Sequence, residues 1–85
     1  MNEYLIKEYI KKLEIDDIKK FAKKKNISIT DTDATILYTY AKNHYQEILD
    51  GNDKLVIKEL RNKLNSNTFK EAYKIYLEYK IKYLS

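Results

Sequence analysis

The clearest helical pattern in the chain lies in residues 34–49, which read ATILYTYAKNHYQEIL. At 100° per residue, the inward positions of this segment fall on one arc of about 140°, which is the width of a core-facing stripe. They are Ala34, Leu37, Tyr38, Ala41, His44, Tyr45, Ile48 and Leu49. Thr30 followed by Asp33 resembles a capping box with Asp in the place of Glu, and Gly51 tolerates the left-handed conformation that often ends a helix. The sequence therefore predicts one long amphipathic helix between Thr30 and Asp50.

Toward the N-terminus, two shorter segments carry the same period. One stripe in the first segment consists of Leu5, Ile6, Tyr9, Ile10 and Leu13. In the second, Asp16 and Asp17 offer an N-cap and a negative charge for the first turn of a helix. Its inward residues are Ile18, Phe21 and Ala22. Residues 26–30, which read NISIT, interrupt the period and predict a short connector.

Toward the C-terminus, Asn52 or Asp53 can begin a fourth helix, with Val56, Ile57, Leu60 and Leu64 facing inward. Thr68 and Glu71 have the spacing of a capping box and predict the start of a fifth helix. The chain has no proline and one glycine, so few positions force a helix to break. We therefore expect a single all-α domain over residues 1–85, a compact bundle of four to five helices. A folded chain of this mass exposes about 5,300 Å².

The amino-acid composition limits what can be concluded from individual residue types. Lys, Ile, Asn and Tyr supply 43 of the 85 residues, whereas Gly, Ala, Arg and Pro supply six. The first group has A/T-rich codons and the second has G/C-rich codons, which indicates an A/T-rich bacterial or phage genome. Lysine runs and scattered tyrosines are therefore weaker signs of nucleic-acid binding than in an unbiased sequence.

Several functional classes are disfavoured by what the sequence lacks. There is no cysteine, which excludes disulfides and thiolate metal sites and suits a reducing compartment. The N-terminal residues do not resemble a secretion signal, and the longest aliphatic run, Leu55–Ile57, is far shorter than a membrane span. We expect a cytoplasmic protein with no membrane partner.

The sequence also offers little for catalysis. His44 is the only imidazole, and it lies at the edge of an apolar arc, which favours a structural role. Asp31–Asp33 and Asp50–Asp53 do not continue into the spacing of a calcium loop, and one glycine cannot form a glycine-rich phosphate loop. We expect no enzyme activity, catalytic residue, metal, cofactor or small-molecule substrate.

Three features recur in one pattern of helix boundaries: Ile15-Asp16-Asp17-Ile18, residues 21–30 (FAKKKNISIT) and a tyrosine-rich C-terminal helix. With these features, residues 10–80 resemble a short family of unknown function from Bacillus-type Firmicutes. The resemblance implies a small helical cytoplasmic protein and brings no known active-site residues.

A lysine cluster is the best electrostatic footprint for nucleic acid. Five cations fall within seven residues: Lys19, Lys20, Lys23, Lys24 and Lys25. Such a cluster can contact phosphates without reading sequence, although a solvated helix face near a C-terminus has the same composition. A helix-turn-helix is disfavoured because Asp31 and Asp33 would face phosphates at the start of its recognition helix. Weak, sequence-independent nucleic-acid binding through Lys19, Lys20, Lys23 and Lys24 is the alternative function.

Apolar residues outside the expected core stripes carry the favoured hypothesis. Ile36 and Tyr40 lie one turn apart, at about 200° and 240° from Ala34 on the helical wheel. The apolar residues of the fifth helix spread over about 240°, more than one core stripe uses. Either this helix is central in the bundle, or part of its surface meets a second protein. We expect a non-catalytic adaptor, inhibitor or regulator that binds another protein, or a second copy of itself, through Ile36, Tyr40, Ile75, Tyr79 and Tyr83.

Overall fold

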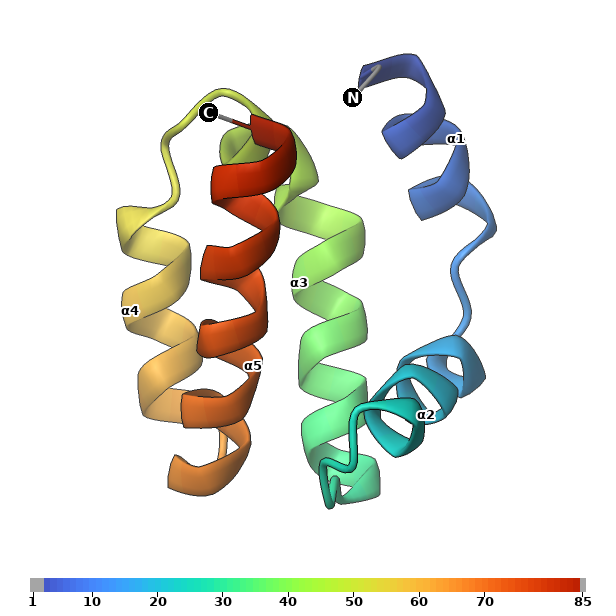
Figure 1. Ribbon diagram of the computed structural model, residues 1–85, viewed down its shortest axis with the longest axis vertical. Coiled ribbons are helices and arrows are strands. Elements are labelled where there is room, and N and C mark those ends of the chain that lie inside the picture. Colours follow the sequence, from blue (N-terminus) through green and yellow to red (C-terminus); the bar gives the residue numbers. More distant parts are fainter. Residues whose placement is uncertain (1–2, 85) are drawn as a thin grey trace.

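The computed structural model describes residues 3–84, and the side chains of residues 3–82. It contains five α-helices: α1 (Glu3–Lys12), α2 (Ile15–Lys24), α3 (Asp31–Leu49), α4 (Lys54–Lys63) and α5 (Ser66–Tyr79). A π-helical turn, η1 (Lys80–Leu84), continues α5. Residues 3–84 contain no strand, so the predicted all-α bundle is confirmed (Figure 1).

Helix α3 is the central element of the bundle. It packs against α1 and α2 on one side and against α4 on the other, while α5 packs against α4 (Figure 1). The most deeply buried apolar residues lie on α2, α3 and α4 and directly after α1 and α4; they are Leu13, Ala22, Ala34, Val56 and Leu64. The central position therefore belongs to the helix with the clearest sequence pattern, and α5 keeps a free side.

Two predicted helix boundaries are confirmed by the structure. The Thr30 hydroxyl accepts a hydrogen bond from the Asp33 backbone N–H at 3.1 Å, which caps α3. At the other end, Gly51 has a φ of 84°, a left-handed conformation that L side chains rarely adopt. These local signals work because each involves residues only a few positions apart.

Two other helix starts differ from the prediction. Helix α2 is capped by Glu14, whose N–H donates to the Asp17 carboxylate at 2.9 Å, so Asp17 lies inside the first turn. Helix α5 is capped by Asn65, and Thr68 lies in its first turn rather than at the cap. The cause is tertiary: the backbone N–H and Nδ2 of Asn65 lie 3.5 and 2.9 Å from the carboxylate of Asp33, which fixes the chain before α5.

The folded chain exposes 6286 Å². This is about 1,000 Å² more than the roughly 5,300 Å² expected for a folded monomer of this mass. In the described part of the chain, no helix is both long and apolar enough to cross a bilayer.

Candidate functional site

An apolar groove of about 510 Å³ lies between the α1–α2 side of the bundle and α5. Its floor is formed by Leu37 and Ala41 of α3. One wall contains Ile10, Leu13, Ile18, Phe21 and Ala22, and the opposite wall contains Ala72, Ile75 and Tyr79. Apart from Asp17, Thr68 and the tyrosine hydroxyls, the lining side chains are hydrocarbon. The groove is therefore suited to an apolar ligand.

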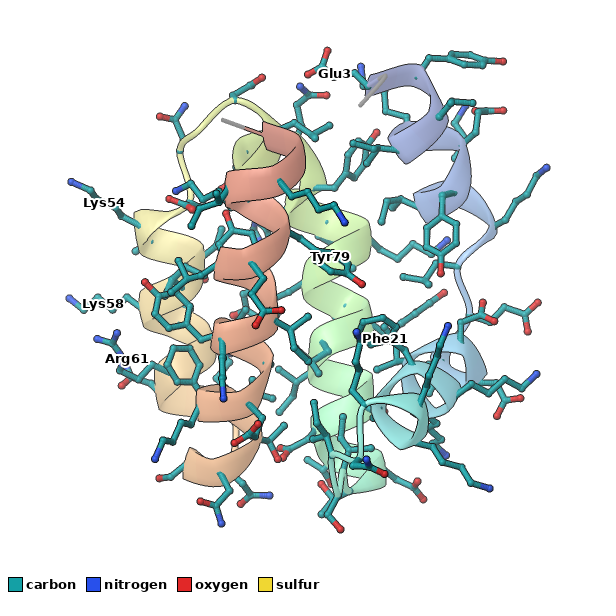
Figure 2. All side chains as sticks on the ribbon, viewed as in Figure 1. Glu3, Phe21, Lys54, Lys58, Arg61 and Tyr79 are labelled. Atoms are coloured by element: carbon teal, nitrogen blue, oxygen red, sulfur yellow. The ribbon has the colours of Figure 1, made fainter. Side chains whose placement is uncertain are left out.

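Two aromatic rings meet at the mouth of the groove. The ring centroids of Phe21 and Tyr79 lie 6.4 Å apart in an edge-to-face arrangement (Figure 2). The two residues are 39% and 41% exposed, and the Lys25 ammonium lies 5.8 and 6.0 Å from their ring centroids. The mouth thus exposes aromatic area, which is enriched at protein interfaces, beside one positive charge.

The predicted interface residues are divided between two places. Ile75 and Tyr79 line the groove. Tyr40 instead lines an internal space of about 180 Å³ between α3, α4 and α5, and its ring stacks on His44 at 5.1 Å. Ile36 and Tyr40 are both half-buried. The Tyr83 side chain lies outside the described residues.

The α1–α2 wall is the part of the site that sequence reasoning missed. Leu13 faces the core as expected, but Tyr9 and Phe21, which were expected to face it too, are exposed where they line the groove. A helical wheel identifies an apolar face but does not show whether that face meets another helix. The exposed fraction of Tyr9, 64%, is visible only in the folded chain.

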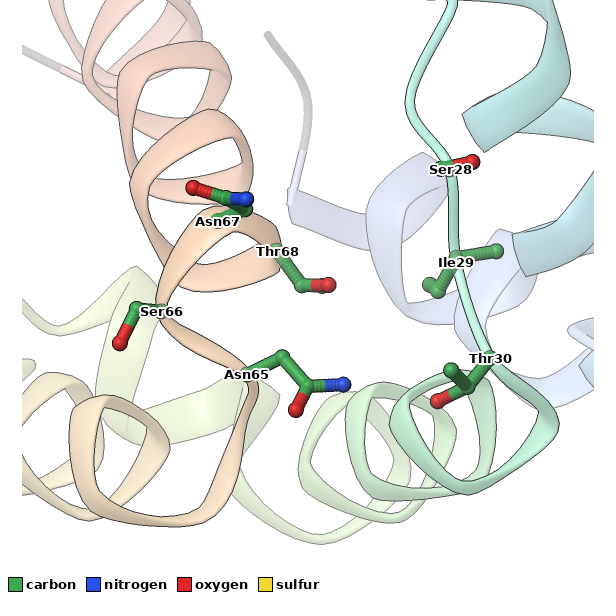
Figure 3. A pocket seen from close by; sticks show the side chains of 7 residues that line it. All are labelled: Ser28, Ile29, Thr30, Asn65, Ser66, Asn67 and Thr68. Carbon is green, nitrogen blue, oxygen red and sulfur yellow. The ribbon is translucent and has the colours of Figure 1, made fainter.

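A polar pocket of about 520 Å³ adjoins one end of the groove. It lies between residues 28–30 and the first turn of α5, as Figure 3 shows. Ile29 and Thr68 line both the pocket and the groove, so the two spaces share a wall. The Thr68 side chain points into the pocket, whereas Ser66 points away from it.

The predicted lysine cluster is partly neutralised by carboxylates. Lys19 forms an ion pair with Asp31 at 2.7 Å. The hydrogen bond between the two groups and their opposite charges raise the pKa of Lys19 and lower the pKa of Asp31. Lys20 lies 3.6 Å from Asp16. Lys23 and Lys24 are exposed on the same helix. The cluster is therefore less positive than its sequence suggests.

A second basic surface lies on α4. Lys54, Lys58 and Arg61 project from the same edge of the molecule (Figure 2), and together with Lys80 they line a hollow of about 450 Å³. Their spacing of four and three residues places them on one helix face. This spacing was a usable signal in the sequence, but the denser run in residues 19–25 obscured it.

Asp53 anchors the start of α4 to the C-terminal helix. The Tyr76 hydroxyl and the Lys80 ammonium both donate to one Asp53 oxygen, at 2.5 and 2.9 Å. These two donors lower the pKa of Asp53. Burial and the neighbouring carboxylate raise the pKa of the Tyr76 hydroxyl. Every group in this cluster has a partner, so the arrangement is suited to holding helices together.

The groups that could serve chemistry are dispersed. His44 lies with its Nδ1 2.8 Å from a Glu47 oxygen on the same helix. Among the residues that the structure describes, no three His, Asp or Glu side chains gather as a metal site would require. The chain matches no family model, no curated protein and no solved structure. The resemblance to the Bacillus-type family therefore stays a prediction.

Proposed function

We propose that the protein is a non-catalytic interaction module that accepts one amphipathic helix of a partner protein in the apolar groove. The observation that carries the proposal is the groove itself, about 510 Å³ of almost wholly hydrocarbon lining that opens to solvent. Exposed apolar grooves are costly to leave uncovered and often mark binding sites. We further propose that the protein acts in the cytoplasm, as its lack of cysteine suggests.

The shape of the groove favours a helix as the occupant. Both walls are helix faces, and three alanines, Ala22, Ala41 and Ala72, leave room along the lining. Amphipathic helices commonly bind by laying an apolar stripe into such a groove. The rings of Phe21 and Tyr79 meet edge to face, and in this position they could cover the side of an incoming helix.

The exposed side chains around the groove favour a macromolecule over a small ligand. Tyr9, Phe21 and Tyr79 line the groove and are 64%, 39% and 41% exposed. A partner helix would cover the groove and these exposed rings together.

The experiment is selection of binders from a displayed library of amphipathic helical peptides about 18 residues, or five turns, long. Peptides selected on the wild-type protein are tested against Tyr79→Asp and against the matched control Leu77→Asp. Tyr79 and Leu77 are 41% and 38% exposed on the same helix, but only Tyr79 lines the groove. We expect Tyr79→Asp to lose the selected peptides and Leu77→Asp to keep them. Equal binding by both variants would contradict the proposal.

A second copy of the chain is the competing occupant. Sedimentation of the wild-type protein and of Tyr79→Asp separates the two cases. A monomeric wild-type protein agrees with a partner helix. A dimer that Tyr79→Asp dissociates would show that the groove serves self-association.

Nucleic-acid binding is the second candidate function, and the basic edge of α4 is a second location for it beside the lysine cluster of α2. Lys54 and Lys58 form no ion pair within residues 3–82, and neither do Lys23 and Lys24, whereas Lys19 and Lys20 are paired. A stripe of cations on one helix can follow a phosphate backbone without reading bases.

A further inference from the structure

The hollow of about 450 Å³ between α4 and α5 takes half of its lining residues from cationic side chains. Lys54, Lys58 and Arg61 belong to α4, and Lys80 directly follows α5. Asp53 is the one carboxylate in this lining. The apolar groove, the polar pocket and the internal space have no lysine or arginine in their linings. Lysine is frequent along the whole sequence, yet around these four spaces the cations are gathered at a single one.

The carboxylate of the hollow is already matched by one of its cations. The Lys80 ammonium donates to an Asp53 oxygen at 2.9 Å. Lys54, Lys58 and Arg61 form no ion pair with any residue in the range 3–82, and they project from the same edge of the molecule (Figure 2). Like charges beside one hollow repel one another, and a concave surface of one sign focuses its field on the solvent in front of it. A multiply charged anion relieves this repulsion.

Arg61 adds a geometry that lysine lacks. It is the only arginine in the chain, so the codon bias that favours lysine does not explain it. Its guanidinium lies over the Phe69 ring, 5.2 Å from the centroid. Stacking uses a face of the guanidinium and leaves the N–H groups in its plane available. This planar fork binds a phosphate through two hydrogen bonds at once.

The row of cations on α4 has the length of a short phosphate chain. Lys54, Lys58 and Arg61 are four and three residues apart and span about 10 Å along the helix axis. A single phosphate would meet only part of this row. Lys63, the next cation of α4, lies 5.7 Å from the Tyr40 ring centroid, so the row ends at Arg61. A nucleic-acid strand carries one charge per roughly 3.4 Å, so only about three of its phosphates would meet the row. A diphosphate or triphosphate group concentrates all its charges within the same length.

We infer that the hollow between α4 and α5 binds the diphosphate or triphosphate group of a small molecule. Arg61 holds one phosphate in its fork, and Lys54 and Lys58 contact the others. The organic part of such a ligand lies against the rest of the lining, which is Ile57, Tyr73 and Leu77. The hollow and the apolar groove share no lining residue, so this inference does not depend on the proposed function.

The test is calorimetric titration of the full chain with inorganic triphosphate, adenosine triphosphate and inorganic phosphate. The buffer contains no magnesium and has an ionic strength of about 0.1 M. Three variants are compared with the wild type: Arg61→Gln, Arg61→Lys and the matched control Lys74→Gln. The control removes one positive charge from an exposed position on α5 that lines none of the four spaces. Thermal melts of all four proteins check that each is folded.

The wild-type protein should bind both triphosphates more tightly than inorganic phosphate. Arg61→Gln should weaken triphosphate binding about tenfold, the effect of losing charge-assisted hydrogen bonds. Arg61→Lys should weaken it by about threefold, because the charge stays and the fork is lost. Lys74→Gln should change the affinity by less than about twofold, because a distant exposed charge is screened.

The controls separate a built site from general positive charge. Equal weakening by Arg61→Gln and Lys74→Gln would overturn the inference, and so would a wild-type protein that binds neither triphosphate. A single-stranded RNA that binds through Arg61 while neither triphosphate binds would assign this face to nucleic acid and would also overturn it. Tighter binding of adenosine triphosphate than of inorganic triphosphate would support a nucleotide as the ligand. Equal binding of the two would support the phosphate chain as the group that is recognised.

Discussion

The hydroxyl of Tyr76 donates a hydrogen bond to the carboxylate of Asp53, which joins the middle of α5 to the residue that begins α4. Lys80 donates to the same oxygen from the turn after α5. Asp53 is 7% exposed, so the interaction is largely shielded from solvent. Few other polar contacts join α5 to the rest of the bundle, and this cluster should therefore matter for stability.

Asp53→Asn should lower the free energy of unfolding by about 1.5 kcal/mol at pH 7, because it removes the charge that two donors share. The pKa of Asp53 is lower in the folded protein than the roughly 3.9 of an unfolded chain. The contribution is thus fully present above about pH 5 and is lost as the pH falls below 4. Measured by urea unfolding, the difference in free energy of unfolding between the wild type and Asp53→Asn should be smaller at pH 3 than at pH 7. Asp16→Asn, at an exposed ion pair, should change stability by less than about 0.5 kcal/mol.

Tyr76→Phe should cost about 1 kcal/mol at neutral pH, the typical net contribution of one hydrogen bond. The pKa of Tyr76 is raised in the folded protein, so its contribution is present below about pH 10, the value for an unfolded chain, and declines above it. The difference between wild type and variant should therefore shrink between pH 9 and about 11. The other eight tyrosines are present in both proteins, so the difference isolates Tyr76. A gap that stays constant across this range would contradict the proposed linkage.

Val56 and Leu55 are neighbours on α4 with opposite environments. Val56 is 1% exposed and Leu55 is 64% exposed. Val56→Ala should lower stability by about 2 kcal/mol through lost burial and a small cavity. Leu55→Ala should change it by less than about 0.5 kcal/mol. Chemical denaturation of the two variants provides the comparison, and similar losses would mean that Leu55 is covered in solution.

The basic edge of α4 can be tested against the lysine cluster of α2. If nucleic acid binds, the double variant Lys54→Gln/Lys58→Gln should lower the slope of log affinity against log salt by about 2, one unit for each lost phosphate contact. Lys19→Gln/Lys20→Gln should leave that slope nearly unchanged, because Asp31 and Asp16 already neutralise these lysines. Fluorescence anisotropy with single-stranded RNA at several salt concentrations measures both. If Lys19→Gln/Lys20→Gln lowers the salt slope more than Lys54→Gln/Lys58→Gln does, the nucleic-acid site lies on α2.

The sequence predicts those parts of the fold that depend on near neighbours. The cap formed by Thr30 and Asp33 and the stop at Gly51 are correct because three or four residues determine each. The prediction that α5 starts at Thr68 was wrong, because Asp33, which lies 32 positions earlier in the chain, holds Asn65.

The groove could not be predicted for a related reason. The apolar faces that include Phe21 and Tyr79 are visible in the sequence, and both were correctly assigned to helices. Whether such faces meet directly or leave a space between them depends on how α1, α2 and α5 pack around α3. Helical periodicity carries no information on that distance.

Ala72→Leu should raise stability and abolish partner binding at the same time. Ala72 lines the groove opposite the α1–α2 wall, and the added side chain would enter space that is empty in the free protein. Burying three further carbon atoms without strain should add about 1 kcal/mol to the free energy of unfolding, as cavity-filling substitutions often do. The same atoms would occupy the volume that a partner helix needs, so the selected peptides should no longer bind. Lys74→Leu, on the exposed side of α5, is the control: its melting temperature should change little and its peptide binding should persist. A variant that gains stability and still binds peptides would show that the partner helix lies elsewhere.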